Sequence, residues 1–284
     1  MSIVLTRWRR LPVVLRAVLA GLFVTFLGEA PWAFLARANV KLSPAIPWAV
    51  VAMGLWLYLY WRYFGGAGWP EETKAARRDN MCRLALPGTI WLWSLVSGGL
   101  AVMSLIALEL IVLRMVHSPA GAQAPTLGIP VYTLLALAIM SALASGIPEE
   151  LGFRGYMQVP LERRYGAPFA VLFVAVLFGL SHLNHGVSVR ILFDFAFGLV
   201  FGVVAWLANS LLPGMILHCA GDVVLFVAGR RIGAALAARP LTGTAGLDAL
   251  FWGCLVAFVG LSFGAFFGLR HLAETAHSRP ATLA

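Results

Sequence analysis

The sequence predicts an all-α, polytopic membrane protein with about eight transmembrane helices and a polar cavity between them. Hydrophobic residues make up 61% of the 284 residues and charged residues only 12%, whereas a soluble domain has about 45–50% and about 25%. A helix needs about 20 mostly apolar residues to cross a bilayer. The apolar segments expected to cross lie at about 11–36, 44–64, 88–113, 129–147, 167–183, 190–208, 213–229 and 247–269.

The charge distribution predicts how these segments are oriented. The net charge is +9, but the basic residues are scattered between apolar segments, so we expect contact with anionic lipid and no nucleic-acid partner. With the N-terminus in the cytoplasm, the cytoplasmic loops and tails hold 13 Lys and Arg and the other side holds seven. This asymmetry predicts that both termini are cytoplasmic. The Ala-, Leu- and Arg-rich composition leads us to expect a bacterial inner membrane.

Ionisable residues inside apolar segments cost free energy and often mark function. Here they gather at the ends of the fourth and fifth segments and within the seventh. Three pairs are spaced by four residues, so the members of each pair share a helix face. The pairs are Glu150/Arg154, Phe178/His182 and His218/Asp222. Adjacent Glu149 and Glu150 point about 100° apart on a helix, so we expect them to differ in role.

Residue counting predicts which of these groups meet. If the fourth and fifth segments form an antiparallel hairpin that turns at Tyr165–Gly166, Glu149 and His182 each lie 16 residues from the turn. They then stand at the same depth, as a carboxylate–imidazole pair requires. His218 follows Pro213 by only five residues, which places it nearer the opposite membrane face. It can reach the other groups only if the seventh segment begins deep in the membrane.

The order of these motifs resembles a known family. The pattern E-E-x-x-x-R, F-x-x-x-H and H-x-x-x-N/D is similar to that of the CAAX protease and bacteriocin-processing (CPBP) family, also called Abi or type II CAAX prenyl endopeptidases. The resemblance covers about residues 129–229 and includes the run from Glu149 to Gly155. Asp222 stands where many members have Asn.

The resemblance implies an intramembrane endopeptidase. In that family pattern Glu149, helped by His182, activates a water to attack a peptide carbonyl, while His218 and the residue at 222 stabilise the oxyanion. The chemistry is sound, because a carboxylate in a low-dielectric site can act as a general base and preorganised donors stabilise developing charge. Glu150, Arg154 and Phe178 are then expected to support the site. The implied partner is a membrane-associated protein or peptide, CAAX-type prenylated in some members.

Two mechanisms remain open at this point. An ionised Asp222 would repel an oxyanion, so it is either protonated or acts by orienting His218. Alternatively, Glu149, His182, His218 and Asp222 bind a divalent metal such as Zn²⁺, which would generate the nucleophile. The sequence lacks H-E-x-x-H, the usual helix-borne zinc motif, so we favour a reaction without a cofactor.

Other functions are weaker alternatives. Intramembrane carboxylates and histidines also build proton-coupled transporters, but those often have repeated halves, and we find no internal repeat. Glu29, Glu109 and Asp194 are expected to pair with neighbouring helices or to lie near the interface. A partner protein that keeps the fold without catalysis is the third reading.

The chain is expected to have three parts. Residues 1–124 would form three transmembrane helices and a cytoplasmic loop, 125–230 a catalytic core of four transmembrane helices, and 231–284 the final helix and C-terminal tail.

Overall fold

The computed structural model describes residues 8, 10–81, 86–115, 128–183, 190–227 and 247–277. In these ranges every regular element is helical and none is a strand. The elements are α2 (Val13–Leu42), α3 (Trp48–Phe64), η1 (Glu71–Thr73), α4 (Lys74–Met81), α5 (Gly88–Met115), α6 (Val131–Glu149), η2 (Glu150–Gln158), α7 (Val159–Tyr165), α8 (Ala167–Ser181), α9 (Arg190–Ala208), α10 (Leu212–Val227) and α12 (Ala249–His277).

Eight long helical stretches in the described ranges correspond to the eight predicted segments, which confirms the fold class. By length and composition, five of the described stretches could cross a membrane, and α8 and α10 are shorter apolar helices. The protein is therefore an integral membrane protein. Several helices exceed their apolar segments: α2 continues to Leu42 and α12 to His277. Apolarity reports only the part of a helix that lies in lipid, so it underestimates helix length.

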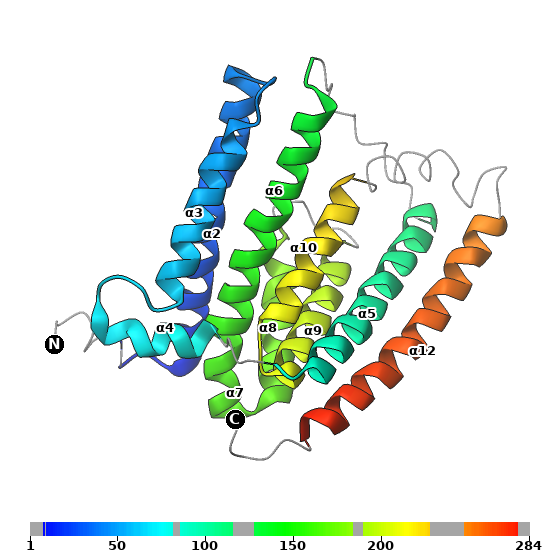
Figure 1. Ribbon diagram of the computed structural model, residues 1–284. Helices are drawn as coiled ribbons and strands as arrows, with labels where there is room; N and C mark the ends of the chain where they lie inside the picture. Colours follow the sequence, from blue (N-terminus) through cyan, green and yellow to red (C-terminus); the bar gives the residue numbers. More distant parts are fainter. Residues whose placement is uncertain are drawn as a thin grey trace.

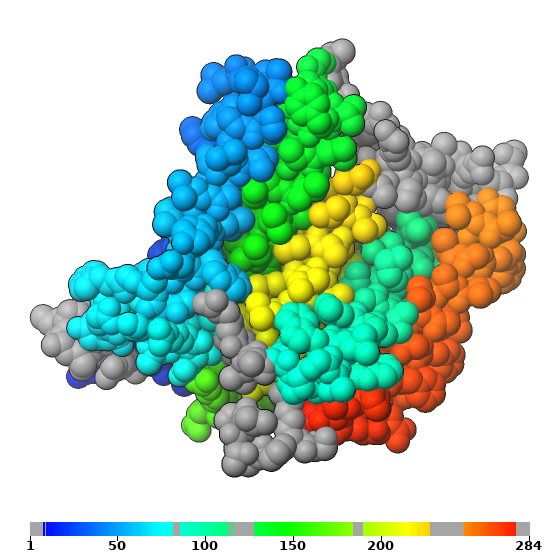
Figure 2. All heavy atoms as spheres, viewed as in Figure 1, coloured from blue at the N-terminus to red at the C-terminus, as the bar shows by residue number. Residues whose placement is uncertain are grey.

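The helices form one bundle, with α2 and α3 at one edge and α5 and α12 at the other (Figure 1). Between these edges lie α6, α8, α9 and α10. The space-filling view shows α10 on one face, between α6 and α5 (Figure 2). The start of α2 and the end of α12 lie on the same side of the bundle (Figure 1). Both predicted domain boundaries, at 124/125 and 230/231, fall outside the described residues, so that division stays a prediction.

The predicted hairpin is present. The elements α6, η2 and α7 form one continuous helical stretch from Val131 to Tyr165, and Gly166 then turns the chain into α8 with φ +86°. A positive φ is readily adopted only by glycine. The turn lies where the sequence predicts it, and it makes the fourth and fifth membrane helices antiparallel neighbours.

The middle of this stretch, η2, is a π-helix of nine residues. Pro148 lies just before it, inside α6, and proline lacks the N–H that would donate to the carbonyl four residues earlier. π-Helical turns are rare and are often found at functional sites. In this chain η2 holds Glu150 and Arg154 of the first motif.

α2 packs on α6 and η2 through small residues. A Cβ on Gly28 would lie 2.4 Å from Pro148, and a Cβ on Gly152 would lie 2.0 Å from the hydroxyl of Thr25. Farther along, Trp32 Nε1 donates a hydrogen bond of 2.9 Å to Ser141 Oγ. Close backbone approach and interhelical hydrogen bonds are what hold helices together in lipid. The contacts fix one antiparallel register of α2 against α6.

α10 begins deep in the bundle. Ser210 and Leu211, which precede it, are 1% exposed. A Cβ on Gly155 would lie 3.2 Å from Leu211, and a Cβ on Gly214 would lie 3.0 Å from Glu150 Oε2. The start of α10 is therefore level with η2 and not with the turn at Gly166. This is the deep start that His218 requires.

Replacing Gly28 by Ala should destabilise the protein by about 1–3 kcal/mol, because the new methyl group overlaps the rigid ring of Pro148. The measurement is the unfolding midpoint of the purified protein in detergent. Gly253→Ala in α12 is the matched control, since a Cβ there meets no described atom within 4 Å. An equal or smaller loss for Gly28→Ala than for the control would contradict the register described above.

Candidate active site

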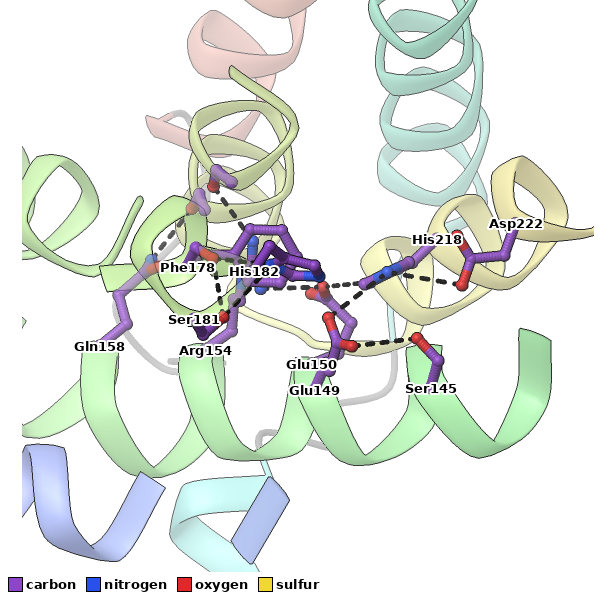
Figure 3. A network of polar contacts seen from close by, with 12 residues as sticks. Ser145, Glu149, Glu150, Arg154, Gln158, Phe178, Ser181, His182, His218 and Asp222 are labelled. Atoms are coloured by element: carbon purple, nitrogen blue, oxygen red, sulfur yellow. Dashed lines mark hydrogen bonds and ion pairs between the residues drawn. The ribbon is translucent and has the colours of Figure 1, made fainter. Parts of the chain in front are cut away.

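A wholly buried carboxylate is the centre of the polar network. Glu150 is 0% exposed, and its Oε1 lies 3.1 Å from Arg154 Nη1 in an ion pair. The same oxygen lies 2.9 Å from His218 Nδ1. Glu150 thus connects η2 to α10 through a residue, His218, that lies 68 positions later in the sequence (Figure 3).

Arg154 has further partners in α8 and α9. Its Nη2 donates a hydrogen bond of 3.2 Å to the carbonyl of Gly198 in α9. The guanidinium lies 4.5 Å from the ring centroid of Phe178 and 5.5 Å from that of Phe201, within the range of cation–π attraction. One helical turn later, Gln158 Nε2 donates to the carbonyl of Gly202 at 3.0 Å. These two parallel contacts bind η2 to α9.

Glu150 also orients His218. An ionised carboxylate can only accept hydrogen bonds, so the hydrogen lies on Nδ1 of His218. The other ring nitrogen, Nε2, lies 3.7 Å from Glu149 Oε2 and 3.9 Å from Asp222 Oδ2. The imidazole stacks on Phe201 with ring centroids 4.7 Å apart and an interplanar angle of 13°. Its position and tautomer are therefore set by the surrounding side chains.

Glu149 differs from its neighbour, as expected. Its Oε1 accepts a hydrogen bond of 3.0 Å from Ser145 Oγ, and its side chain lines a cavity. Figure 3 shows both glutamates on one helix, with Ser145 one turn before Glu149 and His218 facing them from α10. Ser145 has a detectable sequence signal, because it precedes Glu149 by four residues on the same helix face. No sequence pattern indicates the contact of Glu149 with His218.

His182 ends α8 beside the same aromatic ring. Its Nδ1 lies 2.9 Å from the carbonyl oxygen of Phe178 and 3.3 Å from Ser181 Oγ. A carbonyl only accepts, so Nδ1 carries the hydrogen in this contact. The ring of Phe178 lies 5.0 Å from that of His182 and 5.9 Å from that of His218. The structure therefore brings one residue from each of the other motifs, Arg154 and His218, to the same Phe178 ring as His182.

The cavity has a volume of about 440 Å³ and lies at mid-depth along α2 and α6. It is lined by Glu149, His182, His218 and Asp222, together with aromatic and aliphatic side chains. Three carboxylates that the sequence analysis expected to pair with other helices or to lie near the interface also line it. They are Glu29 of α2, Glu109 of α5 and Asp194 of α9. Arg190 is the basic residue in the same wall.

The predicted metal ligands provide suitable donor types, since zinc binds imidazole and carboxylate groups. His218 Nε2 faces two carboxylate oxygens at 3.7 and 3.9 Å, while Nδ1 has the carboxylate partner that a zinc-binding histidine commonly has. In the part of the chain that the structure describes, however, no group of three or more His, Cys, Asp and Glu side chains is arranged to hold a metal ion.

Replacing Glu150 by Gln should destabilise the protein by about 3–5 kcal/mol, because buried Arg154 would lose the carboxylate of its ion pair. Unfolding of the purified protein in detergent measures the loss. The control is Glu274→Gln, which removes an ion pair between side chains that are 68% and 61% exposed and should cost no more than about 1 kcal/mol. Equal losses for the two variants would show that the Glu150 network does not hold the fold.

Comparison with known proteins found a family match for the segment that holds the three motifs. Residues 131–224 match the family described as type II CAAX prenyl endopeptidase Rce1-like. This segment is about a third of the chain, and it contains every residue of the three motifs. No curated protein and no solved structure matches the chain significantly. Residues 131–224 are therefore similar to the type II CAAX prenyl endopeptidases of the Rce1-like family.

Proposed function

We propose that the protein is an endopeptidase that hydrolyses peptide bonds of membrane-associated proteins or peptides inside the cavity. One observation carries the proposal: Glu149 lines the cavity with its Oε2 beside the Nε2 of His218, and the imidazole is itself oriented by a buried carboxylate. A carboxylate beside a fixed imidazole in a site of low dielectric is suited to activating water. The Rce1-like domain supports the same reaction class.

In this mechanism Glu149 takes a proton from water as the oxygen attacks the scissile carbonyl. Ser145 holds its Oε1, which leaves Oε2 for the water. His182 assists: with hydrogen on Nδ1, its Nε2 has the lone pair that accepts a hydrogen bond from water. His218 Nε2 faces the same space and stabilises the oxyanion when it carries a proton.

The supporting residues act on His218 and Glu149 rather than on the substrate. Glu150 and Arg154 form a buried pair behind the cavity, and Phe178 separates the two imidazoles. Asp222 Oδ2 lies 3.9 Å from His218 Nε2, which supports the orienting role over direct contact with an oxyanion. Asp222, which stands where many members of the family have Asn, is therefore compatible with the same mechanism.

The substrate enters a cavity with mixed walls. Aromatic and aliphatic residues of α2, α5, α9 and α10 line much of it, as is usual where an apolar ligand is bound and a few polar groups give orientation. A peptide with an attached lipid fits this chemistry, so we propose CAAX-type prenylated C-termini as a substrate class. We also propose a bacterial inner membrane with both termini cytoplasmic, which agrees with the shared side of the start of α2 and the end of α12 (Figure 1).

Glu149→Gln should lower kcat by about 10²–10⁴-fold, because it removes the general base without changing the shape of the side chain. The assay is cleavage of a farnesylated peptide ending in Cys-aliphatic-aliphatic-Met by purified protein in lipid nanodiscs. Glu162→Gln is the control, since Glu162 lies on the same helical stretch and accepts a hydrogen bond from Gln158 away from the cavity lining. Unchanged cleavage by Glu149→Gln would remove the protease proposal.

We propose that the reaction needs no metal, with Zn²⁺ bound by Glu149, His182, His218 and Asp222 as the alternative. Activity should then persist in the presence of a strong chelator, and metal analysis of the active protein should find less than one equivalent of zinc. Stoichiometric zinc that is lost together with activity in His218→Ala would establish the metal-dependent mechanism instead.

A further inference from the structure

One face of α9 forms a continuous wall of the cavity. Arg190, Phe193, Phe197 and Phe201 all line the cavity, and their spacing of three, four and four residues places them on the same side of the helix. Phe201 marks the catalytic end of this wall, because its ring stacks on His218 with centroids 4.7 Å apart. Phe197 stacks on Phe201 in turn, with centroids 6.3 Å apart. Arg190 therefore lies at the other end, with aromatic rings between it and the imidazole.

The length of this wall suits a short stretch of peptide. Arg190 and Phe201 are 11 residues apart, which is about 16 Å along the helix axis at ~1.5 Å per residue. An extended chain advances about 3.3–3.6 Å per residue, so the wall spans about four or five residues of a substrate. A peptide bond held beside His218 thus has room for a few apolar residues along the phenylalanines before the chain reaches Arg190.

The charges in the cavity favour a negative group at Arg190. Among the described residues that line the cavity, Arg190 is the only Lys or Arg. Apart from two histidines, the other ionisable groups there are the carboxyl groups of Glu29, Glu109, Glu149, Asp194 and Asp222. An anionic group of a substrate is therefore attracted at one end of the wall and repelled elsewhere. Asp194 lies one turn after Arg190 on α9, but a guanidinium has five N–H donors, so Arg190 can bind a ligand carboxylate as well.

We infer that Arg190 binds the C-terminal carboxylate of the substrate and so determines which peptide bond lies at the catalytic groups. The inference rests on the proposed protease function, and it gives Arg190 a binding role with no part in the bond-breaking step. A chain end with apolar side chains and a terminal negative charge matches the order of groups along α9. Because the carboxylate is held about four or five residues from His218, the protein cleaves at a short, fixed distance from the end of a chain.

The experiment uses a farnesylated peptide ending in Cys-aliphatic-aliphatic-Met in two forms, one with a free C-terminal carboxylate and one with a C-terminal amide. Wild-type protein in lipid nanodiscs should cleave the free acid with a kcat/KM at least tenfold higher, because the amide lacks the charge-assisted hydrogen bonds to Arg190. The difference should lie mainly in KM, since this contact is made in the bound substrate as well as in the transition state. Arg190→Gln should lower kcat/KM for the free acid by at least tenfold and change that for the amide by less than about threefold.

Two further variants complete the comparison. Arg163→Gln is the matched control, because Arg163 is an exposed residue of α7 outside the cavity lining, and it should keep the preference for the free acid. Arg190→Lys keeps the positive charge and should prefer the free acid more strongly than Arg190→Gln does. Both peptides are tested on each variant, so a loss of folded protein lowers both rates by the same factor and leaves their ratio unchanged.

The outcomes separate this inference from the proposed function. If wild type cleaves the two peptides equally well, or if Arg190→Gln loses activity equally toward both, Arg190 does not recognise the chain end. Either result would overturn the inference and leave the proposed function standing. A wild-type protein that cleaves neither peptide would remove the protease proposal together with the inference.

Discussion

The rest of the site depends on the buried carboxylate of Glu150. Its Oε1 forms an ion pair with Arg154 and a hydrogen bond with His218 of α10. Arg154 in turn donates a hydrogen bond to α9. In the interior of a membrane protein, a charge that lacks a partner costs several kcal/mol. The three elements are therefore held in an arrangement that gives the buried charges of Glu150 and Arg154 each other as partners. The cavity and the position of His218 both follow from it.

Glycines make this arrangement possible. A Cβ on Gly146 would lie 2.7 Å from Cys219 Sγ, and one on Gly214 would lie 3.0 Å from Glu150 Oε2, so α10 can approach α6 and η2 closely. Gly198 and Gly202 allow the same on α9, where their carbonyl oxygens accept from Arg154 and Gln158. Helices in lipid have no hydrophobic driving force for association. Close packing and hydrogen-bonded polar groups must therefore determine which helices pack together.

The sequence was sufficient for everything that depends on local spacing. The apolar segments predict the eight helical stretches, Gly166 predicts the turn, and the four-residue spacing predicts the Glu150–Arg154 pair. It was insufficient where a contact joins distant helices. Nothing local to His218 indicates that Glu150 would be its partner, because that contact depends on how deeply α10 begins. The depth is set by the packing of Leu211 and Gly214 on η2, which no residue count along one helix can supply.

Glu29 is a second residue whose surroundings the sequence alone does not indicate. Read alone, a carboxylate near the middle of the first membrane helix is as well explained by a pairing between helices as by chemistry. The structure shows more: Gly28 lies against Pro148, and Glu29 and Glu149 line the same cavity. α5 contributes in a similar way, since Val102, Ile106 and Glu109 also line the cavity. The segment that resembles Rce1 therefore does not enclose the cavity by itself, and helices on the N-terminal side of the predicted boundary at 124/125 complete its walls. Under the proposed protease function, differences in those helices are a route to different substrates for the same Rce1-like segment.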